Sequence, residues 1–146
     1  MRTTYLPFLG LVLAGTLVSA PVLGADIQAA VEGLNSAKGH VICGIFQSAD
    51  GFPKDTQKTV KLVIVPASQA GVRCTFTDVA AGTYAISVFH DENDDGVLNT
   101  NFLGMPREGY GVSNNHTYAA HAPGFEESRF TVDAAGSIEL RIRMKY

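Results

Sequence analysis

Oxygen-bearing side chains are concentrated between residues 90 and 99, in the order that a calcium-binding loop uses. Asp91, Asn93 and Asp95 alternate along the chain, and Gly96 follows them. Calcium prefers several oxygen ligands at about 2.4 Å, and short acidic or amide side chains before a glycine turn can bring them together. The predicted ligands, including one backbone carbonyl at the seventh position, are Asp91, Asn93, Asp95, Val97 and Asn99.

The second half of this pattern departs from a calcium-binding loop. The twelfth position holds Phe102 instead of the glutamate that normally binds calcium with both oxygens. A helix–loop–helix calcium hand is therefore excluded, although Asn101, Glu108 or a carbonyl could complete the shell. Two interpretations stay open: a loop ordered by Ca²⁺, and an acidic turn whose side chains cap their own backbone. Magnesium is disfavoured because it rarely takes an all-protein cage, and no other cofactor is predicted.

Catalysis is a second chemistry that the same residues could perform. Asp91, Asp95 and Glu108 could supply paired carboxylates for hydrolysis. Ser113 precedes His116, but no nucleophile elbow or other recognisable frame surrounds it. Charged loops are far commoner than active sites, so we predict a non-catalytic module and keep a small hydrolase as the alternative.

Residues 91–127 lack a clear hydrophobic period, which is typical of a functional loop in a compact domain. Its aromatic residues argue against disorder. The predicted ligand or partner contacts in this segment are Glu108, Tyr110, Ser113, Asn114 and Asn115. We interpret the three histidines nearby, His90, His116 and His121, as surface or core residues, because their spacing suits no metal motif.

The elements that would position this loop are β-strands, because the dominant hydrophobic period is two. In the clearest run, Ile138 to Tyr146, apolar residues alternate with Glu139, Arg141, Arg143 and Lys145, which predicts a half-buried antiparallel strand. Further short runs follow the same rule, with turn signals between most of them. The apolar residues predicted to share a face in these runs are Ile27, Ala29 and Val31; Val60, Leu62 and Ile64; Val72, Cys74 and Phe76; Tyr84, Ile86 and Val88; and Phe130 and Val132, while Val41 to Phe46 is nearly continuously apolar. The sequence predicts an all-β antiparallel sandwich of about seven strands with one long loop.

The two cysteines, Cys43 and Cys74, lie in two of these runs. In an oxidising compartment two cysteines usually pair, so we favour a disulfide over two buried thiols. Such a bridge would stabilise the fold by about 3–4 kcal/mol in the chain-entropy model.

The N-terminal residues have the pattern of an export signal. A positive start at Arg2 is followed by an uncharged apolar run from Leu6 to Val18, which suits a signal peptide and is short for a membrane span. Residues 1–25 are the predicted signal peptide, cut after Gly24 or Ala25, and residues 26–146 form one domain in the periplasm or outside the cell. No later apolar run is long enough to span a membrane.

The charge of the chain bears on its partners. The full sequence has 11 basic and 14 acidic side chains, and removal of Arg2 with the signal peptide lowers the formal charge from −3 to −4. Nucleic acid requires a concentrated basic patch, so it is excluded as a partner. The partner is predicted to be an envelope protein or a small ligand.

Two stretches resemble a bacterial family known as domain of unknown function 2141. They run from Phe76 to Asn93 and from Leu98 to Asn115, and residues 125–127 resemble a later element of the family. The resemblance implies an exported bacterial protein with an immunoglobulin- or transthyretin-like sandwich, and it implies no reaction. The turn before Tyr84 also resembles one in prealbumin-like accessory domains, where this tyrosine would bury its ring and bond to nearby backbone.

Overall fold

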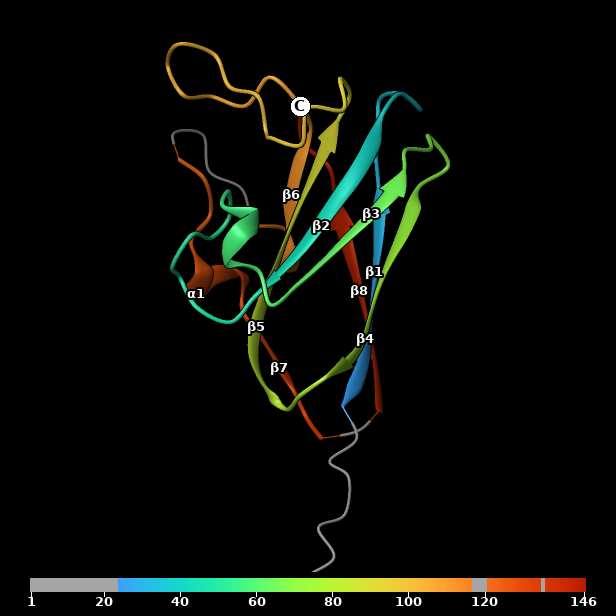
Figure 1. The fold of residues 1–146 in the computed structure, drawn as a ribbon, viewed down its shortest axis with the longest axis vertical. Helices are drawn as coiled ribbons and strands as arrows, with labels where there is room; N and C mark the ends of the chain where they lie inside the picture. The colour runs from blue at the N-terminus through green and yellow to red at the C-terminus, as the bar shows by residue number, and fades with distance from the viewer. Residues whose placement is uncertain (1–23, 117–120, 135) are drawn as a thin grey trace, which may run out of the picture.

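The computed structural model describes residues 24–116, 121–134 and 136–146. Its strands form two packed sheets (Figure 1), one in the order β4-β1-β8 and one in the order β3-β2-β5-β6, with β7 beside the first half of β5. The strands are β1 (Ala25–Glu32), β2 (His40–Phe46), β3 (Lys61–Pro66), β4 (Val72–Val79), β5 (Gly82–Asp91), β6 (Tyr110–Val112), β7 (Phe130–Val132) and β8 (Gly136–Arg143). The short helical turns are η1 (Thr56–Lys58), η2 (Ser113–Asn115) and α1 (Phe125–Ser128). The all-β sandwich is therefore confirmed.

The described residues form eight strands, in agreement with the prediction of about seven, and the additional one is β6, a short strand inside the segment that was predicted to be a loop. One detail of the strand prediction was wrong. The last strand, β8, runs parallel to its neighbour β1, with Ile27 opposite Ile138 and Val31 opposite Ile142. Alternation of apolar and polar residues determines which face of a strand is buried, but it carries no information on the direction of the neighbouring strand.

The main core lies between the two sheets, and alternate residues of each strand point into it. In β5, Tyr84, Ile86 and Val88 point into this core and are almost completely buried. The Tyr84 hydroxyl also donates to the carbonyl of Ala80 at 3.1 Å, as the resemblance implied.

A smaller core covers the outer face of the five-stranded sheet. Phe46 and Ala85 point outward from β2 and β5, and Phe52 and Phe125 pack on them. The Phe52 ring makes edge-to-face contacts with both other rings, at centroid distances of 5.3 and 6.0 Å. The segment after β2 and α1 therefore form a second layer on this face, which is why β2 and β5 are buried on both sides.

The prediction for β3 selected the wrong face. Val60, Leu62 and Ile64 are exposed, with relative accessibilities of 46%, 42% and 55%. Val63 and Val65, by contrast, pack against the core. Every residue from 62 to 65 is apolar, so alternation could not distinguish the two faces of this edge strand.

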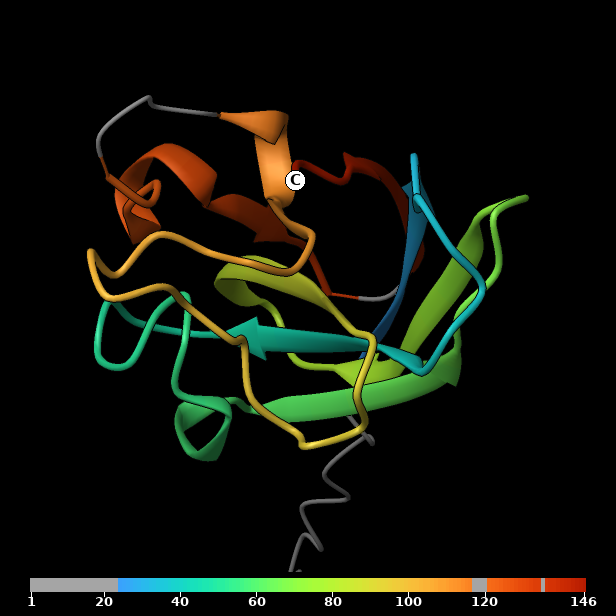
Figure 2. The same cartoon turned by 90° about the horizontal axis from the view of Figure 1, so that it is seen from above.

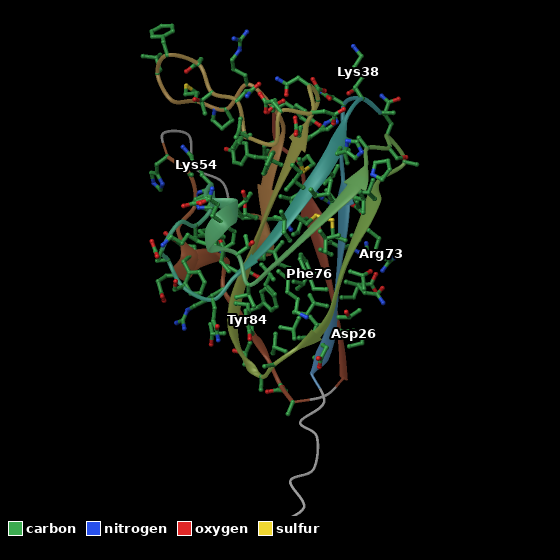
Figure 3. The ribbon with its side chains drawn as sticks, viewed as in Figure 1. Asp26, Lys38, Lys54, Arg73, Phe76 and Tyr84 are labelled. Carbon is green, nitrogen blue, oxygen red and sulfur yellow. A yellow bond between two sulfur atoms is a disulfide. The ribbon has the colours of Figure 1, made fainter. Side chains whose placement is uncertain are left out.

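A disulfide between Cys43 and Cys74 links β2 of one sheet to β4 of the other, as Figure 3 shows. Both cysteines are fully buried, and their Cα atoms lie 6.4 Å apart. The predicted pairing is thus confirmed, and it joins the two layers across the core.

Residues 1–23 of the predicted signal peptide lie outside the described residues, whereas Ala25 is already buried and opens β1. Among the helices that the structure describes, none is long and apolar enough to cross a membrane.

Candidate functional site

The loop between β5 and β6 begins at a buried carboxylate. Asp91 is the last residue of β5 and is only 2% exposed. Its Oδ1 accepts the N–H of Asp95 at 3.1 Å, and its Oδ2 accepts the N–H of Gly96 at 2.8 Å. Both oxygens of this carboxylate therefore hold the turn that follows it.

Glu108 closes the same loop from its other end. This side chain is 6% exposed, and its two oxygens accept the N–H groups of Glu92 at 3.1 Å and Asn99 at 2.9 Å. A carboxylate that accepts two backbone N–H groups is satisfied without water. The predicted contact residue Glu108 thus connects the start, middle and end of the loop.

The remaining predicted calcium ligands converge on one exposed turn. The Asp95 carboxylate accepts both the Asn93 and Asn99 side-chain amides, at 2.9 and 2.8 Å, and the Val97 N–H at 3.0 Å. These hydrogen bonds lower the pKa of the Asp95 carboxyl, and the bond from Asn99 has the largest effect. Among the described residues, no group of three or more His, Cys, Asp or Glu side chains could hold a metal, so a calcium shell here would depend on amide and carbonyl oxygens.

The tip of the loop presents apolar side chains to solvent. Phe102, Leu103 and Met105 are 95%, 70% and 53% exposed. The Asn101 Oδ1 accepts the N–H groups of Leu103 and Met105 at 2.9 and 3.1 Å, and the N–H of Arg107 bonds to the Asn99 carbonyl at 2.8 Å. The backbone of the tip is therefore a hydrogen-bonded turn, from which these apolar side chains extend into solvent.

A pocket of about 160 Å³ lies beneath this tip, on the outer face of the five-stranded sheet. In Figures 1 and 2 the tip, the segment after β2 and α1 lie on the same side of the sandwich. Ser87 and Val112, from β5 and β6, line the pocket together with residues from the loop tip. The complete lining is Pro53, Lys54, Ser87, Leu98, Leu103, Gly104, Met105, Pro106, Tyr110, Val112, His121 and Ala122.

Of the five predicted contact residues, only Tyr110 lines this pocket. Ser113 is fully buried; its Oγ accepts the Ile86 N–H at 2.9 Å and donates to the Ser128 carbonyl. The Asn114 amide donates to the carbonyls of Glu127 and Arg129 at 3.1 and 3.0 Å.

The Asn115 side chain also bonds to backbone groups: it donates to the Arg141 carbonyl at 2.8 Å and accepts the Arg143 N–H at 2.7 Å. The asparagines of η2 and Ser113 thus attach this turn to α1, β5 and β8.

His90 is a core histidine, as the sequence suggested. Its Nε2 donates to the Lys38 carbonyl at 2.8 Å, because a carbonyl can only accept, and its Nδ1 lies within hydrogen-bond distance of the Tyr146 hydroxyl at 2.7 Å. That hydroxyl also accepts the Asn35 N–H at 3.1 Å, and burial raises the pKa of Tyr146. This cluster fastens the segment after β1 to the end of β5.

Sequence reasoning located the loop but missed the pocket. The available signal was a set of apolar residues in an otherwise polar segment: Leu98, Leu103, Met105 and Pro106. Apart from Gly104, the other lining residues come from four further segments, at residues 53–54, 87, 110–112 and 121–122, and only the fold brings them together.

The fold and site together define a small two-sheet β-sandwich whose longest loop covers an apolar pocket. The chain belongs to a family described as an uncharacterized protein conserved in bacteria, domain of unknown function 2141, which it matches over residues 29–139. This range contains every residue that lines the pocket, and it confirms the resemblance seen in the sequence. No curated protein and no solved structure matches the chain.

Proposed function

We propose that this protein is an exported, non-catalytic binding module that takes an apolar group into the pocket beneath the loop tip. The observation that carries the proposal is the pocket itself, which is lined mainly by apolar residues, among them the exposed side chains of Leu103 and Met105. Exposed apolar clusters of this kind are typical of interaction sites. The group that enters belongs to a small ligand or to an envelope protein.

The pocket volume limits what can enter. A cavity of about 150 Å³ lined by aliphatic and aromatic side chains holds one benzene molecule, and the pocket here measures about 160 Å³. One aromatic ring or one branched alkyl group therefore fits. The hydrogen bonds of Asp91 and Glu108 support the proposal, because they hold the covering loop in place before any ligand arrives.

Export is the second part of the proposal. The signal-like N-terminus supports it, and so does the Cys43–Cys74 disulfide, because such bonds persist in oxidising compartments. We place the cleavage after Gly24, because Ala25 already pairs with Val79 and Gly136 at the start of β1. Mass spectrometry of the mature protein from the bacterial envelope measures the new N-terminus, and a chain that still begins with Met1 would refute export by cleavage.

A calcium ion at residues 91–99 is the third part. The convergence of Asn93, Asp95 and Asn99 on one turn supports it: both amides donate to the Asp95 carboxylate through their nitrogen atoms, and rotation of each amide would turn its oxygen toward a bound ion. No observation favours the alternative of a hydrolase: the carboxylates of Asp91 and Glu108 are buried and bonded to their own loop instead of lining the pocket.

The pocket is tested by two-dimensional ¹H–¹⁵N NMR with benzyl alcohol as the probe. We expect shifts at the amides of Ser87, Leu98 and Tyr110 that saturate with probe concentration. Ala122→Trp, which fills the pocket from its exposed rim, should abolish them, whereas Ala70→Trp in the exposed turn between β3 and β4 should not. Absence of saturable shifts in the native chain, or equal shifts in the Ala122→Trp variant, would refute the pocket as a binding site.

A further inference from the structure

Two polar groups that line the apolar pocket have no partner in the described part of the chain. Lys54 is exposed, and its ammonium group makes no hydrogen bond or ion pair there. The nearby Lys58, by contrast, pairs with Asp50 at 3.1 Å. The Tyr110 hydroxyl is also without a partner among the described residues. The backbone of Tyr110, by contrast, pairs with that of Lys145 through both its N–H and its carbonyl.

The position of Lys54 is fixed by its backbone. Its N–H donates to the Gly51 carbonyl at 2.9 Å, within the turn that carries Phe52 onto the outer core. Figure 3 shows Lys54 on the side of the sandwich below the loop tip. An ammonium group therefore lies at the edge of the pocket on an ordered segment.

The charge of the pocket is opposite to that of the whole chain. No Asp or Glu is among the described residues that line it, and the carboxylates of Asp91 and Glu108 point into their own loop, where backbone N–H groups bind their oxygens. The chain as a whole carries a formal charge of −3. A cationic group beside an apolar pocket in an acidic protein selects a ligand that is both apolar and anionic.

We infer that the ligand is a small organic acid: an aromatic ring or branched alkyl group in the pocket, with its carboxylate held by the Lys54 ammonium and the Tyr110 hydroxyl. Both groups donate hydrogen bonds, and a carboxylate accepts them. This inference rests on the proposed function, since it names the chemical class of ligand for the same pocket.

Three probes of one shape test the charge preference: benzoate is anionic, benzamide is neutral and benzamidine is cationic. Their dissociation constants come from NMR titration at low salt. An exposed ion pair favours benzoate over benzamide by about two- to fivefold, and benzamidine binds more weakly than both. Added salt of about 0.5 M reduces the preference, because it screens exposed charges.

Lys54→Gln and Tyr110→Phe should each lower the affinity for benzoate by a larger factor than the affinity for benzamide, because a carboxylate accepts stronger hydrogen bonds than an amide carbonyl. Lys38→Gln is the matched control, because it makes the same change in net charge on an exposed side chain that does not line the pocket. Equal affinities of the native chain for benzoate and benzamide, or equal effects of Lys54→Gln and Lys38→Gln, would refute the organic-acid inference and leave the pocket intact. Absence of binding by all three probes would refute the proposed function as well.

Discussion

Glu108 should control the order of the loop that covers the pocket, and Glu108→Gln tests this with almost no change in size. The native carboxylate accepts the N–H groups of Glu92 and Asn99. A glutamine keeps one acceptor oxygen, but its NH₂ group then faces the other backbone N–H. One charge-assisted hydrogen bond is lost, and one buried N–H is left without an acceptor.

The expected cost follows from these two terms. A hydrogen bond to a charged group contributes about 1.5–3 kcal/mol, and an unsatisfied buried donor costs about 1–3 kcal/mol. The two terms overlap because they describe the same N–H, so we expect a total of roughly 2–4 kcal/mol. Much of this cost falls on local opening of the loop, since the two sheets keep their own core.

Native-state hydrogen exchange of the Glu92 and Asn99 amides measures that opening directly. At 1.4 kcal/mol per tenfold change, exchange at these amides should accelerate by roughly 30- to 700-fold. Glu139→Gln is the control: this exposed residue forms a surface pair with Arg73 at 3.3 Å, and such pairs contribute at most about 1 kcal/mol. Unchanged exchange at both amides in Glu108→Gln would refute the argument that this carboxylate holds the loop.

Three further predictions concern the disulfide, the C-terminal tyrosine and the metal. Joint replacement of Cys43 and Cys74 by Ala should lower the free energy of unfolding by about 3–4 kcal/mol in urea titrations; an unchanged midpoint would contradict it. Burial raises the pKa of Tyr146, so its neutral form is favoured in the folded state. The contribution of this group to the free energy of unfolding is complete below the ordinary tyrosine pKa of about 10. It is lost as the pH rises through the pKa of the folded state. The difference in absorbance at 295 nm between the native chain and Tyr146→Phe, followed against pH, should show that Tyr146 ionises above the ordinary tyrosine pKa. Ionisation of Tyr146 at the ordinary pKa would refute this prediction. Calcium, unlike magnesium, should raise the melting midpoint of the native chain and leave that of Asp95→Ala unchanged; equal responses of the native chain to both ions would argue against the metal.

The sequence was informative where one face of a strand is polar. Alternation placed Ile142 correctly in the core, because a shift by one residue would bury the charges of Arg141 and Arg143. It failed at β3, where Leu62, Val63, Ile64 and Val65 offer two apolar faces and only the neighbouring strands decide between them. It was also silent on strand direction, which is why the parallel pairing of β8 with β1 was not foreseen.

The candidate site was predictable as a segment but not as an arrangement. The spacing of Asp91, Asn93 and Asp95 located the loop, and the structure brings these residues onto one turn. The partners of Asp91 and Glu108 are backbone N–H groups, which every residue except proline possesses. No residue type therefore indicated that these carboxylates would point inward.

The loop places its polar and apolar side chains opposite to what a purely structural loop would require. Burial of Asp91 and Glu108 costs free energy unless their oxygens are bonded, and four backbone N–H groups offset that cost. The same loop leaves Phe102 and Leu103 exposed, where apolar side chains gain nothing from burial. A loop selected only for stability would bury the apolar residues and solvate the acids. The observed arrangement gives up that stabilisation and leaves apolar side chains exposed on a hydrogen-bonded turn beside a pocket, which supports the proposed binding role.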